Sequence, residues 1–221
     1  NALNLNQKQR IKENSQRMLG VVLCYTASKF TLWRQFMNQH RTLRSLILAA
    51  LLGALTAIGA WLQIPVGITS ITLQFLFTAF AGVLLGWKWG AVSQLLYVAI
   101  GLLGLPVFTQ GGGIGYVLQP SFGFLLGLIP AAAVIGALTA RHHSHPAVFL
   151  AALVGDLVLY LVGVPYMYLI MRLYLGSDAT LAALVMKMAV FIPGDLIKLA
   201  IVTLAAPPLL RCLEKAGYTR S

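Results

Sequence analysis

The chain has 221 residues, of which 59% are hydrophobic and only 10% are charged, and its mean hydropathy is +0.83. A soluble domain keeps its surface in water with roughly a quarter of its residues charged, so this composition favours a surface that faces lipid. The two cysteines, Cys24 and Cys212, form no C-x-x-C or metal-spaced pattern, which gives no reason to expect a disulfide framework or a zinc site. The net charge of +11 is typical either of a nucleic-acid-binding protein or of a membrane protein with excess cytoplasmic Lys and Arg.

Residues 1–36 differ from the rest of the chain. A polar, basic stretch is followed by Met18–Trp33, which is too weakly apolar for a membrane span. Two interpretations stay open: an interfacial helix, or a leader upstream of a start at Met37. We therefore separate an N-terminal extension, 1–36, from a membrane domain, 37–221.

Six segments are predicted to be membrane-spanning helices, which need about 20 mostly apolar residues. In chain order they are Leu46–Leu62, Leu73–Gly86, Ala91–Leu105, Phe122–Ala140, Ala147–Leu175 and Val190–Leu210. The second and third are short, so we expect them to end below the membrane surface, beside a loop that protein covers. The sequence thus predicts an all-α integral membrane protein built as a bundle of six transmembrane helices.

The positive charges orient this bundle. Six spans place both termini on one side, and if that side is the cytoplasm, thirteen Lys and Arg are cytoplasmic while only Arg172 and Lys187 are external. Lys198 lies within the sixth span. This bias satisfies the positive-inside rule, so we expect a multi-pass protein of the cytoplasmic membrane with both termini in the cytoplasm. The same distribution leaves no argument for nucleic acid as a partner.

Small residues recur in the first predicted span at Ala49, Gly53 and Ala57, with Ala50 and Ala54 beside them. A spacing of four places the first three on one helical face, where another backbone can approach closely. Two interpretations stay open: the face packs within this protein's own bundle, or it docks a separate subunit.

The longest irregular stretch between predicted spans is 105–121, which has four glycines within 111–115. Such a loop can fold back over a pocket as a lid, and Phe108 and Tyr116 argue against a purely solvated linker. It is not a phosphate-binding loop, because G-x-x-x-x-G-K-[ST] is absent from the chain.

The sixth predicted span begins with Pro193-Gly194, followed by Asp195 and Lys198. Proline suits the first turn of a helix, and a carboxylate there is favoured by the positive end of the helix dipole. Lys198 follows at i+3, on the same face. Mutual pairing would reduce the cost of placing both charges in the membrane, but the break in the helix beside them favours a polar ligand site.

Three further polar residues lie at membrane depth. Asp156 lies inside the fifth predicted span, with Tyr160 one turn later on the same face, so Asp156 must face the bundle interior. It could be a ligand contact, a proton site or half of a structural pair. Gln74, at the outer start of the second span, could hydrogen-bond a ligand.

His142, His143 and His145 cluster in the short inner loop. Such a run is more typical of a basic turn near anionic lipid than of a metal site, so we predict no metal. The chain has no G-x-S-x-G, and no His lies within a predicted span, so we predict no enzymatic activity.

Four pieces of the sequence together resemble the BioY family, the biotin-binding S components of energy-coupling-factor (ECF) vitamin transporters. These are Ile71-Thr-Leu-Gln74, Leu105-Pro-Val-Phe108, the loop that ends in Pro120-Ser121, and Phe191-Ile-Pro-Gly-Asp-Leu-Ile-Lys198. The resemblance covers about residues 41–213. It implies six helices with cytoplasmic termini, a biotin site that opens outward, and a first helix whose Ala/Gly face docks the transmembrane T subunit. The ATPase subunits of the complex would supply the energy, and biotin would be the transported ligand rather than a cofactor.

The resemblance implies ligand-binding roles for Asp195 and Lys198, and further polar contacts at Gln74 and Ser121. Tyr160 matches a Tyr-x-x-Gly pattern in the fifth helix. The chain departs from the family at Gln119-Pro-Ser-Phe-Gly123, where Gly-Pro-Thr-Gly-Gly is frequent, and at Asp156, where an apolar residue is expected. The candidate ligand-binding residues are Gln74, Tyr116, Ser121, Asp156, Tyr160, Asp195 and Lys198. The alternatives are an S component for another vitamin, such as thiamine or riboflavin, and a secondary transporter driven by ions through Asp156 or Asp195.

Overall fold

The structure is a computed structural model that describes residues 42–66, 69–178, 180–216 and 218. The chain divides into two compact units, Asn1–Leu43 and Arg44–Ser221. Only Thr42 and Leu43 of the first unit are described, so the extension 1–36 lies outside the described residues.

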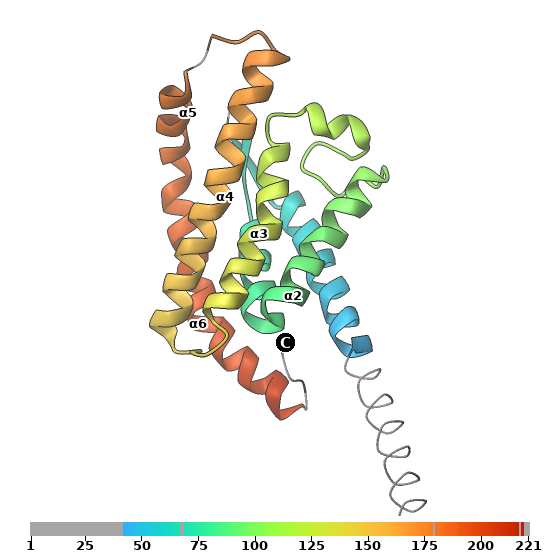
Figure 1. Ribbon diagram of the computed structural model, residues 1–221, viewed down its shortest axis with the longest axis vertical. Coiled ribbons are helices and arrows are strands. Elements are labelled where there is room, and N and C mark those ends of the chain that lie inside the picture. The colour runs from blue at the N-terminus through green and yellow to red at the C-terminus, as the bar shows by residue number, and fades with distance from the viewer. Residues whose placement is uncertain (1–41, 67–68, 179, 217, 219–221) are drawn as a thin grey trace, which may run out of the picture. The chain divides into compact units, whose positions relative to one another are not determined.

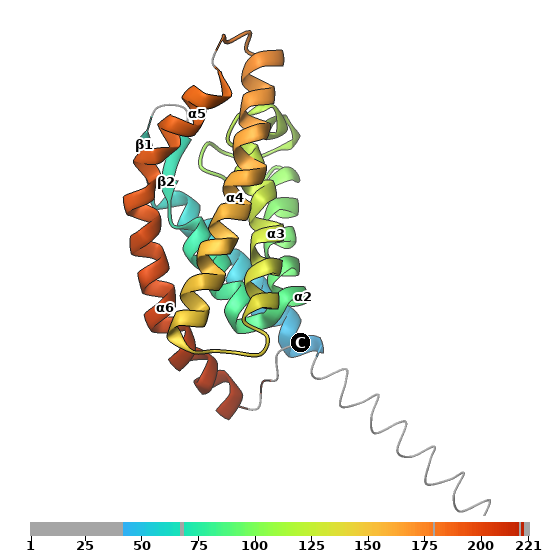
Figure 2. The same ribbon diagram turned by 60° about the vertical axis from the view of Figure 1, so that its left-hand side comes forward.

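Helices make up most of the described chain (Figure 1). A helix over Thr42–Trp61 comes first. The later elements are β1 (Gln63–Val66), β2 (Thr69–Thr72), α2 (Gln74–Leu102), the 3-10 helix η1 (Ile114–Leu118), α3 (Phe122–Leu138), α4 (His145–Leu173), α5 (Leu181–Met188), the 3-10 helix η2 (Ala189–Phe191) and α6 (Ile192–Lys215). α3 packs between α2 and α4, and α6 packs along α4 (Figures 1 and 2).

Four described helical segments are long and apolar enough to cross a membrane, and α3 is a shorter apolar helix. The four are Thr42–Trp61, Gln74–Leu102, His145–Leu173 and Leu181–Lys215. Their outward faces carry large apolar side chains, such as Leu161 and Leu204, which are 73% and 68% exposed. Surfaces of this kind suit lipid, which cannot hydrogen-bond to polar groups. The prediction of an all-α membrane protein with several apolar spans is confirmed.

α2 is two helical arms rather than one straight helix. Gly86 has φ 84° and ψ −179°, a region that is essentially restricted to glycine. The arms run antiparallel, because Gln74 bonds Tyr97 and Thr78 bonds Gln94 across them. The second and third predicted spans fall on these two arms.

A short β-hairpin between the first helix and α2 was not predicted. β1 and β2 pair antiparallel, with Gln63 opposite Thr72. The hairpin reaches the start of α6, since a Cβ on Gly194 would lie 3.5 Å from Ile71 Cγ2 (Figure 2). It thereby brings the side chains of β2 to the beginning of α6.

Candidate functional site

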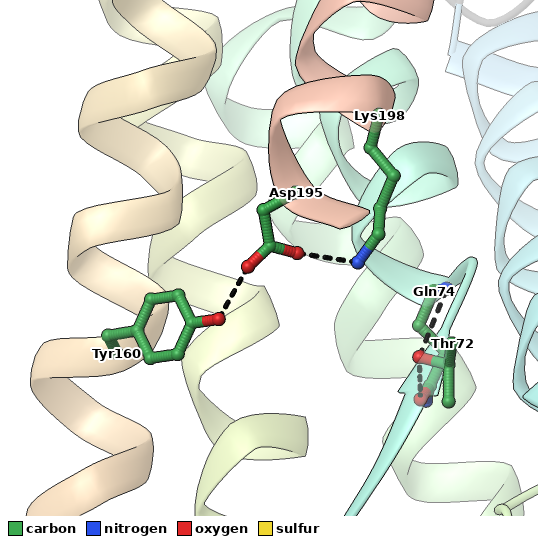
Figure 3. A network of polar contacts seen from close by, with 5 residues as sticks. All are labelled: Thr72, Gln74, Tyr160, Asp195 and Lys198. Atoms are coloured by element: carbon green, nitrogen blue, oxygen red, sulfur yellow. Dashed lines mark hydrogen bonds and ion pairs between the residues drawn. The ribbon is translucent and has the colours of Figure 1, made fainter. Parts of the chain in front are cut away.

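The start of α6 presents a buried ion pair. Pro193 occupies the first turn and Asp195 follows it there, as predicted. Lys198 Nζ lies 2.6 Å from Asp195 Oδ1, and each residue is only 6% exposed (Figure 3). Two opposite charges at this distance neutralise each other in an environment where either alone would be costly.

Tyr160 of α4 completes this cluster from the opposite side. Its hydroxyl donates to Asp195 Oδ2 at 2.5 Å (Figure 3). The ring is fixed by an edge-on contact with Phe124 of α3, with centroids 6.0 Å apart. The two oxygens of Asp195 are therefore each engaged by one donor of the protein.

A cavity of about 90 Å³ borders this cluster. Its polar lining residues are Ser70, Thr72, Gln74, Thr109, Tyr116, Ser121, Tyr160, Asp195 and Lys198. Its apolar walls are Phe75, Phe124, Leu125, Leu128, Leu159, Met188 and Phe191. Convergent polar side chains beside aromatic and aliphatic walls are typical of small-ligand sites, and this cavity has more polar than apolar lining residues.

Gln74 reaches the cavity from the first turn of α2, and its amide is held from two sides. Thr72 Oγ1 donates to Gln74 Oε1 at 2.9 Å, and Gln74 Nε2 donates to the Tyr97 hydroxyl at 2.7 Å. The Tyr97 hydroxyl in turn donates to the carbonyl of Val107 at 3.1 Å. These bonds fix the amide in one orientation and tie it to the glycine-rich loop.

The glycine-rich loop folds onto the bundle and covers one side of the cavity. Phe108 and Tyr116 are 1% and 5% exposed, so the loop is not a solvated linker. The Tyr116 hydroxyl lies 2.8 Å from Thr109 Oγ1 and 3.5 Å from Ser121 Oγ. Tyr166 of α4 donates to the carbonyl of Val117 at 2.6 Å and holds the loop down.

Asp156 is the one candidate ligand residue that does not line this cavity. It lines a neighbouring apolar groove of about 920 Å³ between α4 and the α5–α6 segment. It is 7% exposed, and its Oδ1 has no hydrogen-bond partner among the described residues. Asp156 therefore lies beside the main cavity rather than in its lining, and its role stays a prediction.

The small-residue face of the first helix points inward rather than outward. Ala49 is fully buried, a Cβ on Gly53 would lie 2.9 Å from Ser93 O, and Ala57 packs against the main core. These contacts favour the first of the two interpretations, packing within the protein's own bundle. Ala50 and Ala54 are the exposed small residues of this helix.

The histidine cluster contains one structural contact. His145 Nδ1 lies 2.7 Å from the carbonyl of Thr203 in α6. That carbonyl has no helical partner at i+4, because Pro207 lacks an N–H. No group of three metal-binding side chains occurs among the described residues.

Sequence reasoning missed Ser70, Thr72 and Thr109 as lining residues. Ser70 and Thr72 reach the cavity because β2 lies against α6, and a strand of four residues leaves little periodicity to detect. Thr109 lies in the predicted lid loop, but its sequence context offered no specific signal.

Known proteins share this architecture. The BioY family model matches residues 19–215. The chain is 48% identical to a probable biotin transporter of Lysinibacillus sphaericus, over 65% of this chain and 74% of that protein. It is 33% identical to the biotin transporter of Thermotoga maritima, over 74% of this chain and 94% of that protein.

A solved structure is also similar. It is the S-component for biotin from an ECF-type ABC transporter, with a TM-score of 0.70 and 27% identity. The match covers 78% of this chain and 93% of that one. Sequence and structure agree in their result: the chain belongs to the BioY family.

Proposed function

We propose that this chain binds biotin in the cavity beside Asp195 and Lys198 and carries it across the cytoplasmic membrane as the S component of an ECF-type transporter. The observation that carries the proposal is the buried ion pair at the edge of a cavity with apolar walls. The names of the matched relatives support biotin as the ligand.

The chemistry of biotin fits these groups. Its ureido ring offers N–H donors and a carbonyl acceptor, and the rest of the molecule is a thioether ring, an apolar chain and a carboxylate. The carboxylate of Asp195 accepts hydrogen bonds from N–H groups, and the ammonium of Lys198 donates to a carbonyl or pairs with a carboxylate. Phe124 and Leu128 are among the apolar walls that would cover the rings and the chain.

The proposed topology is six crossings with both termini in the cytoplasm. The first helix, the two arms of α2, α3, α4 and α6 supply the six. The excess of Lys and Arg in the predicted inner segments supports this orientation.

ATP-driven transport needs partner subunits, since this chain has no phosphate-binding motif of its own. We propose that the transmembrane T subunit docks on the exposed pair Ala50 and Ala54, where small side chains permit close helix approach.

Replacing both Ala50 and Ala54 by Leu should abolish co-purification with the T and ATPase subunits while biotin binding and thermal stability are retained. Gly53→Leu is the matched control. It should lower the melting temperature, because the Cβ of the new side chain would collide with the backbone oxygen of Ser93. Complex formation that survives the double replacement would contradict this docking face.

Calorimetry of the purified protein tests the ligand. We expect biotin to bind at one site per chain, and thiamine and riboflavin to give no heat. Binding of one of those two vitamins without biotin binding would assign the cavity to another vitamin. Biotin uptake that follows an ion gradient without ATPase subunits would favour the secondary transporter.

A further inference from the structure

A ligand that reaches Asp195 needs more space than the cavity offers, and Tyr160 is the neutral side chain that borders both the cavity and Asp195. Lys198 and Tyr160 each hold one oxygen of Asp195. The cavity of about 90 Å³ is smaller than the roughly 300–1,000 Å³ of most small-molecule sites. Releasing Lys198 would separate a buried ion pair, whereas Tyr160 is neutral and costs less to displace. Tyr160 is therefore the donor that gives way.

Tyr160 has space to move into. It lines both the cavity and the neighbouring apolar groove of about 920 Å³, as do Met188 and Asp195, so these three side chains lie between the two spaces. The groove walls beyond Tyr160 are aliphatic, with Leu157 and Leu161 on α4 and Val185 on α5. A tyrosine ring that turns toward the groove leaves the cavity without displacing any other polar group.

An acceptor for the displaced hydroxyl is already present on the groove side. Asp156 lies one helical turn before Tyr160 on α4, on the same face. Side chains four residues apart on one helical face are neighbours, and long helical side chains lean toward the preceding turn, so a turned Tyr160 ring would approach Asp156. Oδ1 of Asp156 is buried and has no partner among the described residues. A carboxyl oxygen accepts a hydrogen bond whether the group is ionised or neutral.

We propose that Asp156 is a positioning residue that receives the Tyr160 hydroxyl when a ligand takes its place on Asp195. The inference rests on the proposed biotin binding. Without ligand, Tyr160 bonds Asp195 and closes the cavity. With ligand, Tyr160 bonds Asp156, the cavity widens toward α4, and Asp195 is free to accept from the ligand. Asp156 acts through Tyr160 and does not touch the ligand.

The test combines biotin calorimetry with thermal melting of ligand-free protein. Asp156→Leu removes a buried polar atom that has no partner, so the melting temperature without ligand should stay equal or rise. The same change should weaken biotin binding about threefold to tenfold, because Tyr160 loses its second acceptor. Asp156→Asn keeps a carbonyl oxygen and should restore most of the affinity. In a Tyr160→Phe background, Asp156→Leu should change the affinity no further.

Each contrary result has a separate meaning. Unchanged biotin affinity in Asp156→Leu overturns the inference. The inference is also overturned if Asp156→Leu weakens biotin binding as much in the Tyr160→Phe background as in the wild type. A lower melting temperature without ligand would show that Asp156 has a structural role, which also overturns it. A wild-type protein that binds no biotin overturns the proposed function and this inference together.

Discussion

Two buried polar networks in this fold are of opposite character. The amide network consists of Thr56, Thr78, Ser93 and Gln94. The ion-pair cluster consists of Tyr160, Asp195 and Lys198. The members of the amide network are fully buried and neutral, and none of them lines the cavity. The ion-pair cluster is charged and forms part of the cavity wall.

The amide network joins the first helix to both arms of α2. Gln94 Nε2 donates to Thr56 Oγ1 at 3.3 Å, and Thr78 Oγ1 lies 3.0 Å from Gln94 Oε1. The Thr56 hydroxyl donates to the carbonyl of Leu52, and the single O–H of Thr78 is shared between Gln94 Oε1 and the carbonyl of Gln74. Every polar group of this set has a partner, so it specifies packing and has no group left for a ligand.

The contrast shows which buried polar groups are available for binding. Both networks lie in helices within the apolar bundle, and burial alone does not separate them. What separates them is a cavity on one side and, one helical turn from Tyr160, an oxygen of Asp156 that has no partner in the described part of the chain. We expect the amide network to stabilise the fold and the ion-pair cluster to bind the ligand.

The largest effect is expected from Lys198→Met. It leaves the carboxylate of Asp195 buried without its counter-charge, which should cost about 3–5 kcal/mol of stability and abolish biotin binding. Adding Asp195→Asn removes the stranded charge and should restore the melting temperature but not the affinity. If Lys198→Met alone melts like wild type, the pair is not buried in the functional protein.

A smaller effect is expected from Gln94→Leu. The two threonines keep their helical carbonyl acceptors, so the loss should be about 1–2 kcal/mol of stability. Biotin affinity should remain within about twofold of wild type, since Gln94 does not line the cavity. Thermal melting and calorimetry of the same preparation measure both quantities. A large loss of affinity at unchanged stability would reverse the roles given to the two networks.

Asp195 and Lys198 could be predicted from the sequence more completely than the residues that surround them. Pro193, Asp195 and Lys198 could be placed on one helical turn because helix-start chemistry and i, i+3 spacing are local rules. The partner hydroxyl of Tyr160 comes from 35 residues away, a contact that local rules do not specify. The family resemblance, rather than spacing, indicated Tyr160.

The small-residue face shows a second limit of sequence reasoning. Ala49 and Gly53 lie on one face of the first helix, and Ala50 and Ala54 lie one residue further round. Both sets have the same spacing of four, so periodicity cannot say which one faces inward. Only the contact of Gly53 with Ser93 O in the second arm of α2 decides it.

The most direct test of the central claim is calorimetric titration of biotin into wild type, Asp195→Asn and Asp195→Asn/Lys198→Met, each first shown to be folded by thermal melting. A hydrogen bond to a charged group contributes roughly 1.5–3 kcal/mol, so Asp195→Asn should weaken biotin binding about tenfold to a hundredfold. The double variant should bind no better than Asp195→Asn. Unchanged affinity in the folded double variant would contradict a ligand role for this pair.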